Sequence, residues 1–405
     1  MAKVFYNLFL LLYSAGIRIA ALLKNDKAKK RLHGIKQPLP TFSEKTIWMH
    51  CASLGEFEQG RPLLEKIRKI HPSYKIVLSF FSSSGYEMRK NFSGADIVVY
   101  LPEDSKRNAE EFLNSINPAI VFWVKYEYWY YFLKTINKRK IPLYLVSAMF
   151  RPDQPFFKWY GGLYREMLKF FTLIFVQTQE SKELISSFTG KVIVAGDTRL
   201  DRVLELPLAA ADFPILEEFT HKQQTLIAGS TWVEDDAVLA HYVNQNPDKK
   251  FIIAPHEIFP ANLQNMLRYY HSAEFYSALK GLPKSNVIIL DTIGMLNKIY
   301  RYATVVYIGG GFNDSGIHNL AEAAVYNKPV VFGPVYDKFP EATALILNGG
   351  AASIRNAPEL EKELNKLFND DTNLKQASFK AGEYIKTHAG ATDIIMNNIE
   401  LRQIN

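Results

Sequence analysis

From Thr46 onward, short apolar runs alternate with amphipathic segments. The runs are rich in Val and Ile and continuously apolar, which is typical of parallel strands covered on both faces. A first series of predicted strands comprises Thr46–Ala52, Lys75–Phe81, Asp96–Leu101, Ala119–Val124, Pro142–Phe150, Leu173–Gln177 and Val192–Ala195. A second series follows Pro214 and comprises Gln224–Ala228, Lys250–Ala254, Asn286–Leu290, Thr304–Ile308 and Pro329–Phe332.

Helical segments such as Pro62–Ile70 and Ala109–Ile116 separate these strands. A βα alternation that occurs twice predicts an α/β protein with two Rossmann-like lobes, which we expect to face each other across a cleft. The 405 residues are too many for one ordinary core, which favours the same division. We therefore predict domains over residues 46–205 and 218–372, followed by C-terminal helices over 373–405.

The N-terminus has a different pattern, because the segment from Val4 to Leu23 is almost wholly apolar. We predict a membrane anchor over residues 1–23 and a basic linker over 24–45. About 20 apolar residues is borderline for crossing a bilayer, and Arg18 within the run makes an interfacial helix an equal alternative to a span. Basic residues after an apolar helix tend to stay cytoplasmic and attract anionic lipids. A buried N-terminal helix is the other alternative; no cleavage site for a signal peptide is evident.

Composition excludes several classes of function. A single cysteine rules out an intrachain disulfide framework, and no spacing of His, Cys, Asp or Glu predicts a metal site. The formal net charge of +7 is a modest bias towards anionic partners, but no basic and aromatic stripe predicts nucleic-acid binding. The sequence also lacks a P-loop motif, and no G-x-G-x-x-G follows the first strand.

Three candidate catalytic residues follow strands of the first series. Glu56 lies in the segment CASLGEFEQGRP, where a strand passes through a turn into a helix, and it is a candidate general base. Its alternative role is to complement the helix dipole. Glu127 lies among aromatic residues after the fourth strand. This segment is either a candidate acceptor-binding site or the start of a helix with packed aromatic rings. Arg199 is a candidate for stabilising an anion, although a surface arginine is the commoner explanation.

The second series has a set of strand ends that favours a nucleotide ligand. Ser230 lies in a turn of small residues suited to phosphate, and Gly310 and Gly311 allow close approach of the backbone. We expect the segment Gly309–Glu322 to open a helix that carries His318 and Glu322 on one face. Several strand ends that meet at one edge predict a nucleotide-binding site there.

Taken in order, the segments ASLGEFEQGRP, YEYW, GDTRLD, IAGST, LDTIGML and GGGFNDSGIHNLAEAA resemble those of 3-deoxy-D-manno-octulosonic acid (Kdo) transferases. The resemblance implies a GT-B glycosyltransferase that is inverting and needs no metal or other cofactor. It implies a lipid A precursor as acceptor on the first lobe and CMP-Kdo as donor on the second. Glu56 would be the general base, and Glu127 and Arg199 would have supporting roles. The residues that match donor-binding segments are Pro255, His256, Gly294, Met295, Leu296, Asn319, Leu320, Ala321 and Glu322.

The chain departs from the family pattern at three positions. The family usually has arginine at the position of His256, an acid at Lys125 and lysine at Arg199. The resemblance, with the apolar helix, implies a protein on the cytoplasmic face of the inner membrane, in contact with anionic lipids. Two alternatives stay open: a GT-B transferase or epimerase that uses a UDP-sugar, and a non-catalytic nucleotide-sugar-binding protein. The number of Kdo residues transferred is also open.

Overall fold

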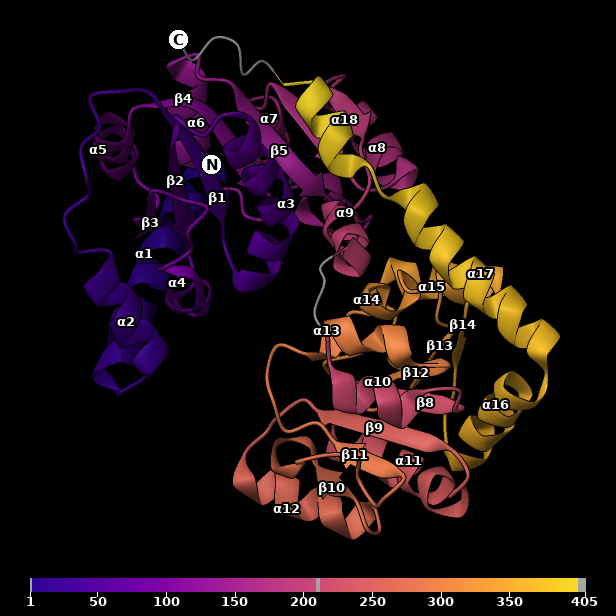
Figure 1. Cartoon of the computed structure of the whole chain (residues 1–405). Coiled ribbons are helices and arrows are strands. Elements are labelled where there is room, and N and C mark those ends of the chain that lie inside the picture. The colour runs from indigo at the N-terminus through magenta and orange to yellow at the C-terminus, as the bar shows by residue number, and fades with distance from the viewer. Residues whose placement is uncertain (1, 209–211, 400–405) are drawn as a thin grey trace. The chain divides into compact units, whose positions relative to one another are not determined.

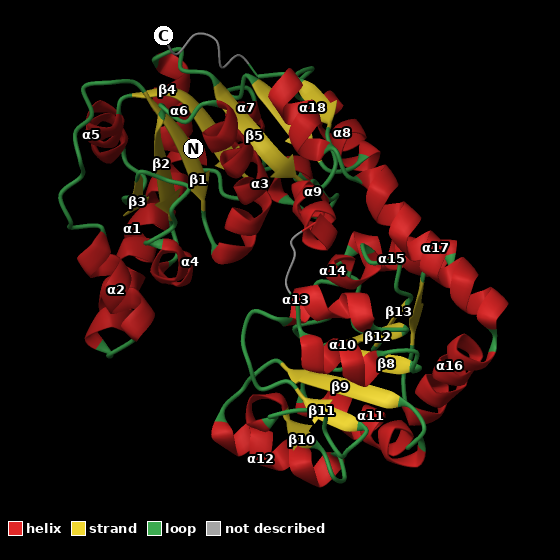
Figure 2. Cartoon of the chain, viewed as in Figure 1, coloured by secondary structure: helices red, strands yellow, loops and turns green. Residues whose placement is uncertain are grey.

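The computed structural model describes residues 2–208 and 212–399, and it contains two parallel sheets of seven strands each (Figures 1 and 2). The first sheet has the order β3-β2-β1-β4-β5-β6-β7, and the second has the order β10-β11-β9-β8-β12-β13-β14. Every strand pairs in parallel with its neighbours. The predicted α/β class with two parallel sheets is therefore confirmed.

The strand bounds follow the predicted runs closely. The first sheet consists of β1 (Thr46–Cys51), β2 (Lys75–Phe80), β3 (Ile97–Tyr100), β4 (Pro118–Val124), β5 (Leu143–Ala148), β6 (Leu173–Val176) and β7 (Val192–Val194). The second consists of β8 (Thr225–Thr231), β9 (Lys250–Pro255), β10 (Glu274–Phe275), β11 (Val287–Ile289), β12 (Val305–Ile308), β13 (Val330–Phe332) and β14 (Ala351–Ser353). The sequence analysis missed β10 and β14. Both lie at sheet edges and are too short to show a periodicity.

The chain folds into two compact units. The first extends from the N-terminus to Asp201 and includes the chain again from Gly390, whereas the second extends from Arg202 to Ala389. Helices of the first unit are α1 (Ala2–Leu22), α2 (Asp26–Gly34), α3 (Leu54–Ile70), α4 (Ser83–Arg89), α5 (Lys106–Ile116), α6 (Tyr130–Lys138), α7 (Gly162–Leu168), α8 (Gln179–Ser186) and α18 (Ala391–Asn397), while α9 (Thr198–Glu205) passes the boundary. The second unit has α10 (Pro214–Thr220), α11 (Val233–Gln245), α12 (Pro260–Tyr269), α13 (Leu296–Ile299), α14 (Ala321–Ala324), α15 (Pro340–Asn348), α16 (Ala357–Asn369) and α17 (Asp371–His388).

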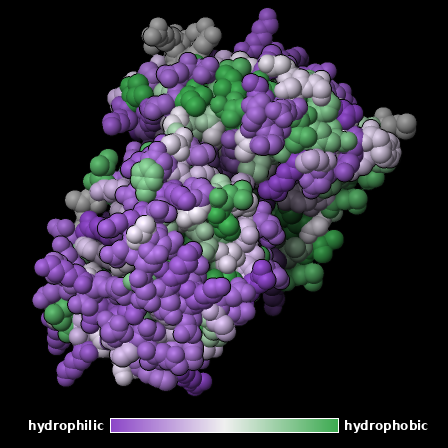
Figure 3. Space-filling view, turned by 90° about the vertical axis from the view of Figure 1, so that its right-hand side faces the viewer, coloured by the Kyte–Doolittle hydropathy of each residue, from purple (hydrophilic) through white to green (hydrophobic). Residues whose placement is uncertain are grey.

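Helices cover both faces of the first sheet, as continuous apolar strands require. All six residues of β1 are buried, with Trp48 on one face and Met49 on the other. The Trp48 face packs against α5 and α6, and the Met49 face packs against α3 and α18. Most of the surface seen in Figure 3 is hydrophilic, and its apolar side chains form small groups. The cores thus lie between each sheet and its helices.

Helix α1 packs along the first unit by one face only. Tyr6 donates a hydrogen bond to Asp104 (2.6 Å), Ser14 donates to Glu103 (3.0 Å), and Asn7 accepts from Tyr131 (2.8 Å). No residue of α1 is buried, so the alternative of a buried N-terminal helix is wrong. Within the described part of the chain, α1 is the one helix long and apolar enough to cross a membrane. Its opposite face is exposed and apolar, and the side chains with the largest exposure there are Val4, Phe5, Leu11, Leu12 and Leu22.

Helix α2 is fastened to the same unit by a buried arginine. The Arg31 guanidinium donates to the carbonyl oxygens of Phe81 and Leu101, which follow β2 and β3, and it lies 3.6 Å from the centre of the Phe81 ring. Arg31 belongs to the segment that the sequence analysis treated as a basic linker. The linker is thus partly a structured helix, because its arginine completes the hydrogen bonds of two strand ends.

The chain re-enters the first unit at α18. The Asp201 carboxylate accepts hydrogen bonds from the backbone amides of Gly390 and Thr392, the latter at 2.6 Å. Gly390 has φ +106°, a backbone conformation that favours glycine. A carboxylate at a helix N-terminus satisfies amides that have no partner within the helix. Asp201 therefore caps a helix that lies far away in the sequence.

We predict that Asp201→Ala releases this contact. Loss of a capping carboxylate costs about 1–2 kcal/mol, which should increase the exchange rate of the amides in residues 390–397 by roughly 5–30-fold. Hydrogen exchange read by mass spectrometry measures this effect. Glu205→Ala removes an exposed carboxylate from α9 and is the matched control. Equal exchange in the two variants would contradict the capping role.

Candidate functional site

Glu56 lies in the first turn of α3, directly after β1. Ser53 caps this helix through its side chain, so α3 begins at Leu54 rather than at the predicted Pro62. The Glu56 carboxylate accepts a hydrogen bond from the Ala52 amide, and only 7% of the residue is exposed. Burial raises the pKa of Glu56 to about 7, and the negative charge of Glu127 contributes to the increase. The side chain thus changes protonation close to neutral pH, which suits a general base.

Glu127 lies beside Glu56 because β4 is the neighbour of β1. The Trp129 indole donates to the Glu127 carboxylate at 2.8 Å, and the Trp123 indole donates to the Glu127 carbonyl oxygen at 2.6 Å. His50 Nε2 lies 3.6 Å from the same carboxylate. Burial lowers the pKa of His50, and Glu127 opposes that effect. Two indoles therefore fix Glu127, whose side chain remains partly exposed.

Lys125 and Tyr126 connect β4 to Glu127. Lys125 has φ +66°, which turns the chain sharply at the end of the strand. The positive charge of Lys125 and a hydrogen bond from the Tyr126 backbone both lower the pKa of Glu56, against the larger effect of burial. Lys125 thus occupies the usual position of a family acid, and its charge favours the ionised form of Glu56.

Arg199 lies in the first turn of α9, after β7. Its guanidinium donates to both oxygens of Asp197, at distances from 2.6 to 3.2 Å. Burial raises the pKa of the Tyr126 hydroxyl. The charges of Arg199, Asp197 and Glu56 also shift this pKa, so all three lie near Tyr126. Arg199 therefore lies at the same sheet edge as Glu56, but as half of an ion pair. The sequence analysis did not foresee this pair.

The second unit has a stack of three aromatic rings at the ends of its central strands. His256 follows β9, and its ring centre lies 4.5 Å from that of Trp232 and 4.5 Å from that of His318. The Trp232 indole also donates to Nε2 of His318 at 3.1 Å. Burial lowers the pKa of His318 to about 4, and the neighbouring His256 contributes. His318 is thus a neutral acceptor, and the His256 ring stays exposed.

Glycines allow three loops of this unit to touch by their backbones. A Cβ on Gly309 would lie 2.3 Å from the Ser230 carbonyl oxygen, and one on Gly311 would lie 2.6 Å from the Gly333 amide. Gly310 has φ +91°, and its amide donates to buried Asp235 at 2.8 Å. The loop after β12 therefore depends on glycine at these positions, and buried Asp235 holds it in place.

The segment Gly309–Glu322 does lead into a helix, but the prediction that His318 and Glu322 share a helical face is wrong. Helix α14 comprises only Ala321–Ala324, and His318 lies in the loop before it, so His318 and Glu322 do not share a helical face. Asn319 accepts a hydrogen bond from the Ala321 amide and donates to Glu322 at 3.0 Å. The helix thus begins only at Ala321, after a loop with positive φ at Gly310 and Gly316.

The other predicted donor residues lie at the corresponding strand ends. Pro255 is the last residue of β9, and Ser230, with φ +55°, lies within β8. Gly294 has φ +88° and precedes Met295 and Leu296 at the start of α13. Leu320 and Ala321 are buried. Sequence reasoning missed Trp232 and Asp235, although the acidic turn after the IAGST segment was a signal for a helix start.

Comparisons with known proteins show which family the chain is similar to. The model for 3-deoxy-D-manno-octulosonic-acid transferase (kdotransferase) matches residues 26–202. The Kdo transferase of Rickettsia felis is 25% identical over 362 residues, which cover 85% of this chain and 76% of the relative. That of Aquifex aeolicus is 26% identical over 339 residues, which cover 81% and 88%.

A third relative, the bifunctional glycosyltransferase/methyltransferase of Fusobacterium nucleatum, is 25% identical over 381 residues. These residues cover 88% of this chain but only 58% of the Fusobacterium protein, so this chain spans less than two thirds of that relative's length.

Solved structures identify the fold. UDP-GlcNAc 2-epimerase from Neisseria meningitidis has a TM-score of 0.63 at 17% identity and covers 87% of this chain and 98% of its own. The calicheamicin glycosyltransferase CalG4 has a TM-score of 0.55 at 13% identity, with coverages of 88% and 98%. Acinetobacter baumannii MurG has a TM-score of 0.54 at 12% identity, with 87% and 98%. These likenesses confirm the predicted GT-B-like fold.

We predict that the buried Glu56 carboxyl makes stability depend on pH. Because its pKa is raised from 4.5 to about 7, the folded state holds a proton that the unfolded state releases, and stability falls as pH rises through this window. Glu56→Gln should therefore gain up to about 3 kcal/mol in unfolding free energy relative to the parent between pH 4.5 and pH 8. Urea unfolding across this range tests the prediction, with exposed Glu44→Gln as control. A difference that does not vary with pH would contradict it.

Proposed function

Because this chain belongs to the family of 3-deoxy-D-manno-octulosonic-acid (Kdo) transferases, we propose that it transfers Kdo from CMP-Kdo to a hydroxyl of a lipid A precursor (lipid IVA). The observation that carries the mechanism is the position of Glu56, buried in the first turn of α3 at the end of β1, where burial raises its pKa to about 7. In its ionised form, Glu56 takes the proton of the acceptor hydroxyl. The oxygen then attacks the anomeric carbon of Kdo from the side opposite the leaving CMP, which inverts the configuration.

In this proposal the first unit binds the acceptor. Glu127 positions it, because the Trp129 indole holds the Glu127 carboxylate while part of it stays accessible. Arg199 offsets negative charge that develops in the reaction, and Asp197 fixes its guanidinium. Lys125, close enough to lower the pKa of Glu56, keeps more of the base ionised at neutral pH.

The second unit binds CMP-Kdo. The exposed His256 ring offers a stacking surface next to Trp232, where the family usually has an arginine. Ser230 and the loop of Gly310 and Gly311, which packs against Gly333, are the proposed phosphate-binding part of this site. Among the matched segments, Gly294 to Leu296 and Asn319 to Glu322 complete the donor site. The proposed reaction requires no metal or other cofactor, and nucleic acid is not a partner.

We also propose that α1 attaches the protein to the cytoplasmic face of the inner membrane. Its inner face is hydrogen-bonded to the first unit through Tyr6 and Ser14, while Phe5, Leu8 and Leu12 point outward at helical spacing. Lys24, Lys27, Lys29 and Lys30 follow it and attract anionic lipid headgroups. A helix held in this way lies in the membrane interface.

We predict that the membrane contact depends on the outward face of α1. The triple variant Phe5→Ser, Leu8→Ser, Leu12→Ser should lower partitioning into phosphatidylglycerol vesicles by at least about tenfold, because apolar area no longer leaves water. Flotation on a density gradient measures the partitioning. Leu347→Ser with Phe379→Ser removes exposed apolar side chains elsewhere and is the control. Unchanged flotation of the α1 variant would exclude the proposed contact.

We predict that the protein adds Kdo to a tetra-acylated lipid A precursor when CMP-Kdo is generated in the assay, and that Glu56→Gln lowers kcat by about 100- to 10,000-fold. Mass spectrometry of the lipid counts the Kdo units added. The kcat/KM of the parent should rise with pH and level off above about 7, since the base must be ionised. The Gln variant should bind CMP like the parent. Full activity of the variant would refute the role of Glu56, and binding of UDP in place of CMP would favour the UDP-sugar alternative.

A further inference from the structure

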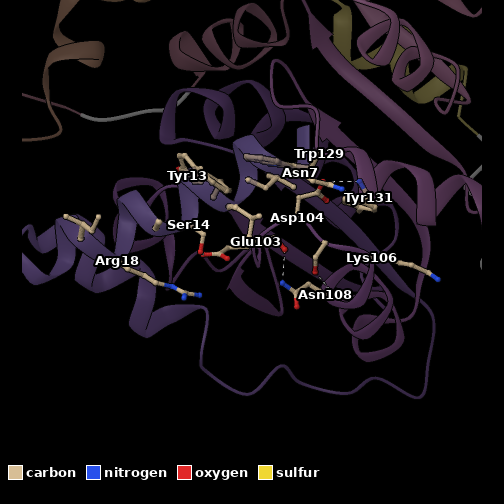
Figure 4. A pocket seen from close by; sticks show the side chains of 16 residues that line it. Asn7, Tyr13, Ser14, Arg18, Glu103, Asp104, Lys106, Asn108, Trp129 and Tyr131 are labelled. Atoms are coloured by element: carbon tan, nitrogen blue, oxygen red, sulfur yellow. Dashed lines mark hydrogen bonds between the residues drawn. The ribbon is translucent and has the colours of Figure 1, made fainter. Parts of the chain in front are cut away.

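A cavity of about 950 Å³ lies between α1 and the ends of the first sheet (Figure 4). We call it the α1 pocket. The residues that line it include Leu10, Ile19, Phe81, Lys106 and Trp129. Its volume is in the upper part of the roughly 300–1,000 Å³ range of small-molecule sites. The pocket belongs wholly to the first unit, and of the residues that line it the mechanism proposed above uses only Trp129.

The pocket offers mainly apolar surface to a ligand. Leu10, Leu11 and Ile19 of α1 form one wall, and the Phe81 and Trp129 rings, stacked 4.7 Å apart, form the other. Figure 4 shows Arg18 and Lys106 at opposite sides of the pocket. An apolar interior with cations at its rim suits a hydrocarbon chain that carries an anionic group.

The acidic groups around the pocket already have partners. Asp104 accepts hydrogen bonds from Tyr6 and from the backbone amides of Tyr131 and Phe132, each at 2.6–3.0 Å. Glu103 accepts from Ser14 at 3.0 Å. These bonds satisfy the hydrogen-bonding capacity of both carboxylates, and the negative charge that they keep does not repel an uncharged acyl chain. A ligand therefore meets apolar walls and the rim cations rather than free acid.

The pocket joins two features described above. Leu11 and Ile19 line it and also belong to the exposed face of α1 that we place in the membrane. At its other end is Trp129, whose indole holds the Glu127 carboxylate 2.8 Å away. A chain that enters from the membrane side of α1 would thus end beside the residues that position the acceptor.

We propose that the α1 pocket binds an acyl chain of the lipid acceptor. The inference rests on the proposed function, because the acceptor is taken to be an acylated lipid. The bound chain would fix where the headgroup lies, so the pocket would select an acceptor by its acyl chains before the reacting hydroxyl meets Glu56.

Photolabelling in phosphatidylglycerol nanodiscs tests the proposal without CMP-Kdo, so its result does not depend on transfer. The probe is a tetra-acylated lipid A precursor with a diazirine at the end of one acyl chain, and phosphatidylglycerol with the same group is the reference. We expect the acceptor probe to label peptides that contain Leu10, Phe81 or Trp129, and the reference to label the outward face of α1. Equal labelling of the pocket by both probes would overturn the proposal.

A matched pair of variants adds a second readout. Ala15 lines the pocket and is exposed, so Ala15→Trp should fill its entrance, abolish the pocket label and raise the KM of the acylated acceptor by about tenfold or more at unchanged kcat. Ala2→Trp makes the same change on α1 outside the pocket and should alter neither. Transfer with no pocket label would refute the pocket alone. Pocket label with no transfer would refute the proposed function and leave an acyl-chain site.

Discussion

The parallel direction of every strand is the constraint on which both sites depend. In a parallel sheet all carboxyl ends lie on one edge, so loops that are far apart in sequence meet there if their strands are neighbours. β1 pairs with β4, which brings Glu56 and Glu127 together. β8 pairs with both β9 and β12, which assembles the stack of Trp232, His256 and His318. A single antiparallel strand would send its loop to the opposite edge.

The same constraint explains how much the sequence could predict. Buried parallel strands leave a strong apolar signal, and a residue placed just after such a strand is automatically a site candidate, as Glu56 was. Residues whose role depends on a partner in a different loop give no such signal. The contact of Trp232 with His318 and that of Asp235 with Gly310 join segments far apart in the sequence, so they could be found only once the fold was known.

The start of helix α14 is an element that the sequence analysis predicted wrongly. Residues 309–319 are rich in glycine, asparagine and other poor helix formers, with positive φ at Gly310 and Gly316, and the helix begins only at Ala321. Low helix propensity and the close approach of backbones at Gly309 and Gly311 therefore favour the same extended loop, and the prediction gave too little weight to the glycines. The short edge strands β10 and β14 were missed for a related reason, because two or three residues cannot establish a period.

The return of the chain at Gly390 has a consequence for how the protein forms. The second unit is an insertion within the first, because Arg202–Ala389 separates the body of the first unit from its final helix. On the ribosome, the first unit can bury most of its sheet early, but the part of the apolar face that Ala391 and Ile395 cover stays exposed until residues 390–397 have been made. Synthesis of the first unit thus begins before that of the second unit and finishes after it, so the second unit can fold while the first is incomplete.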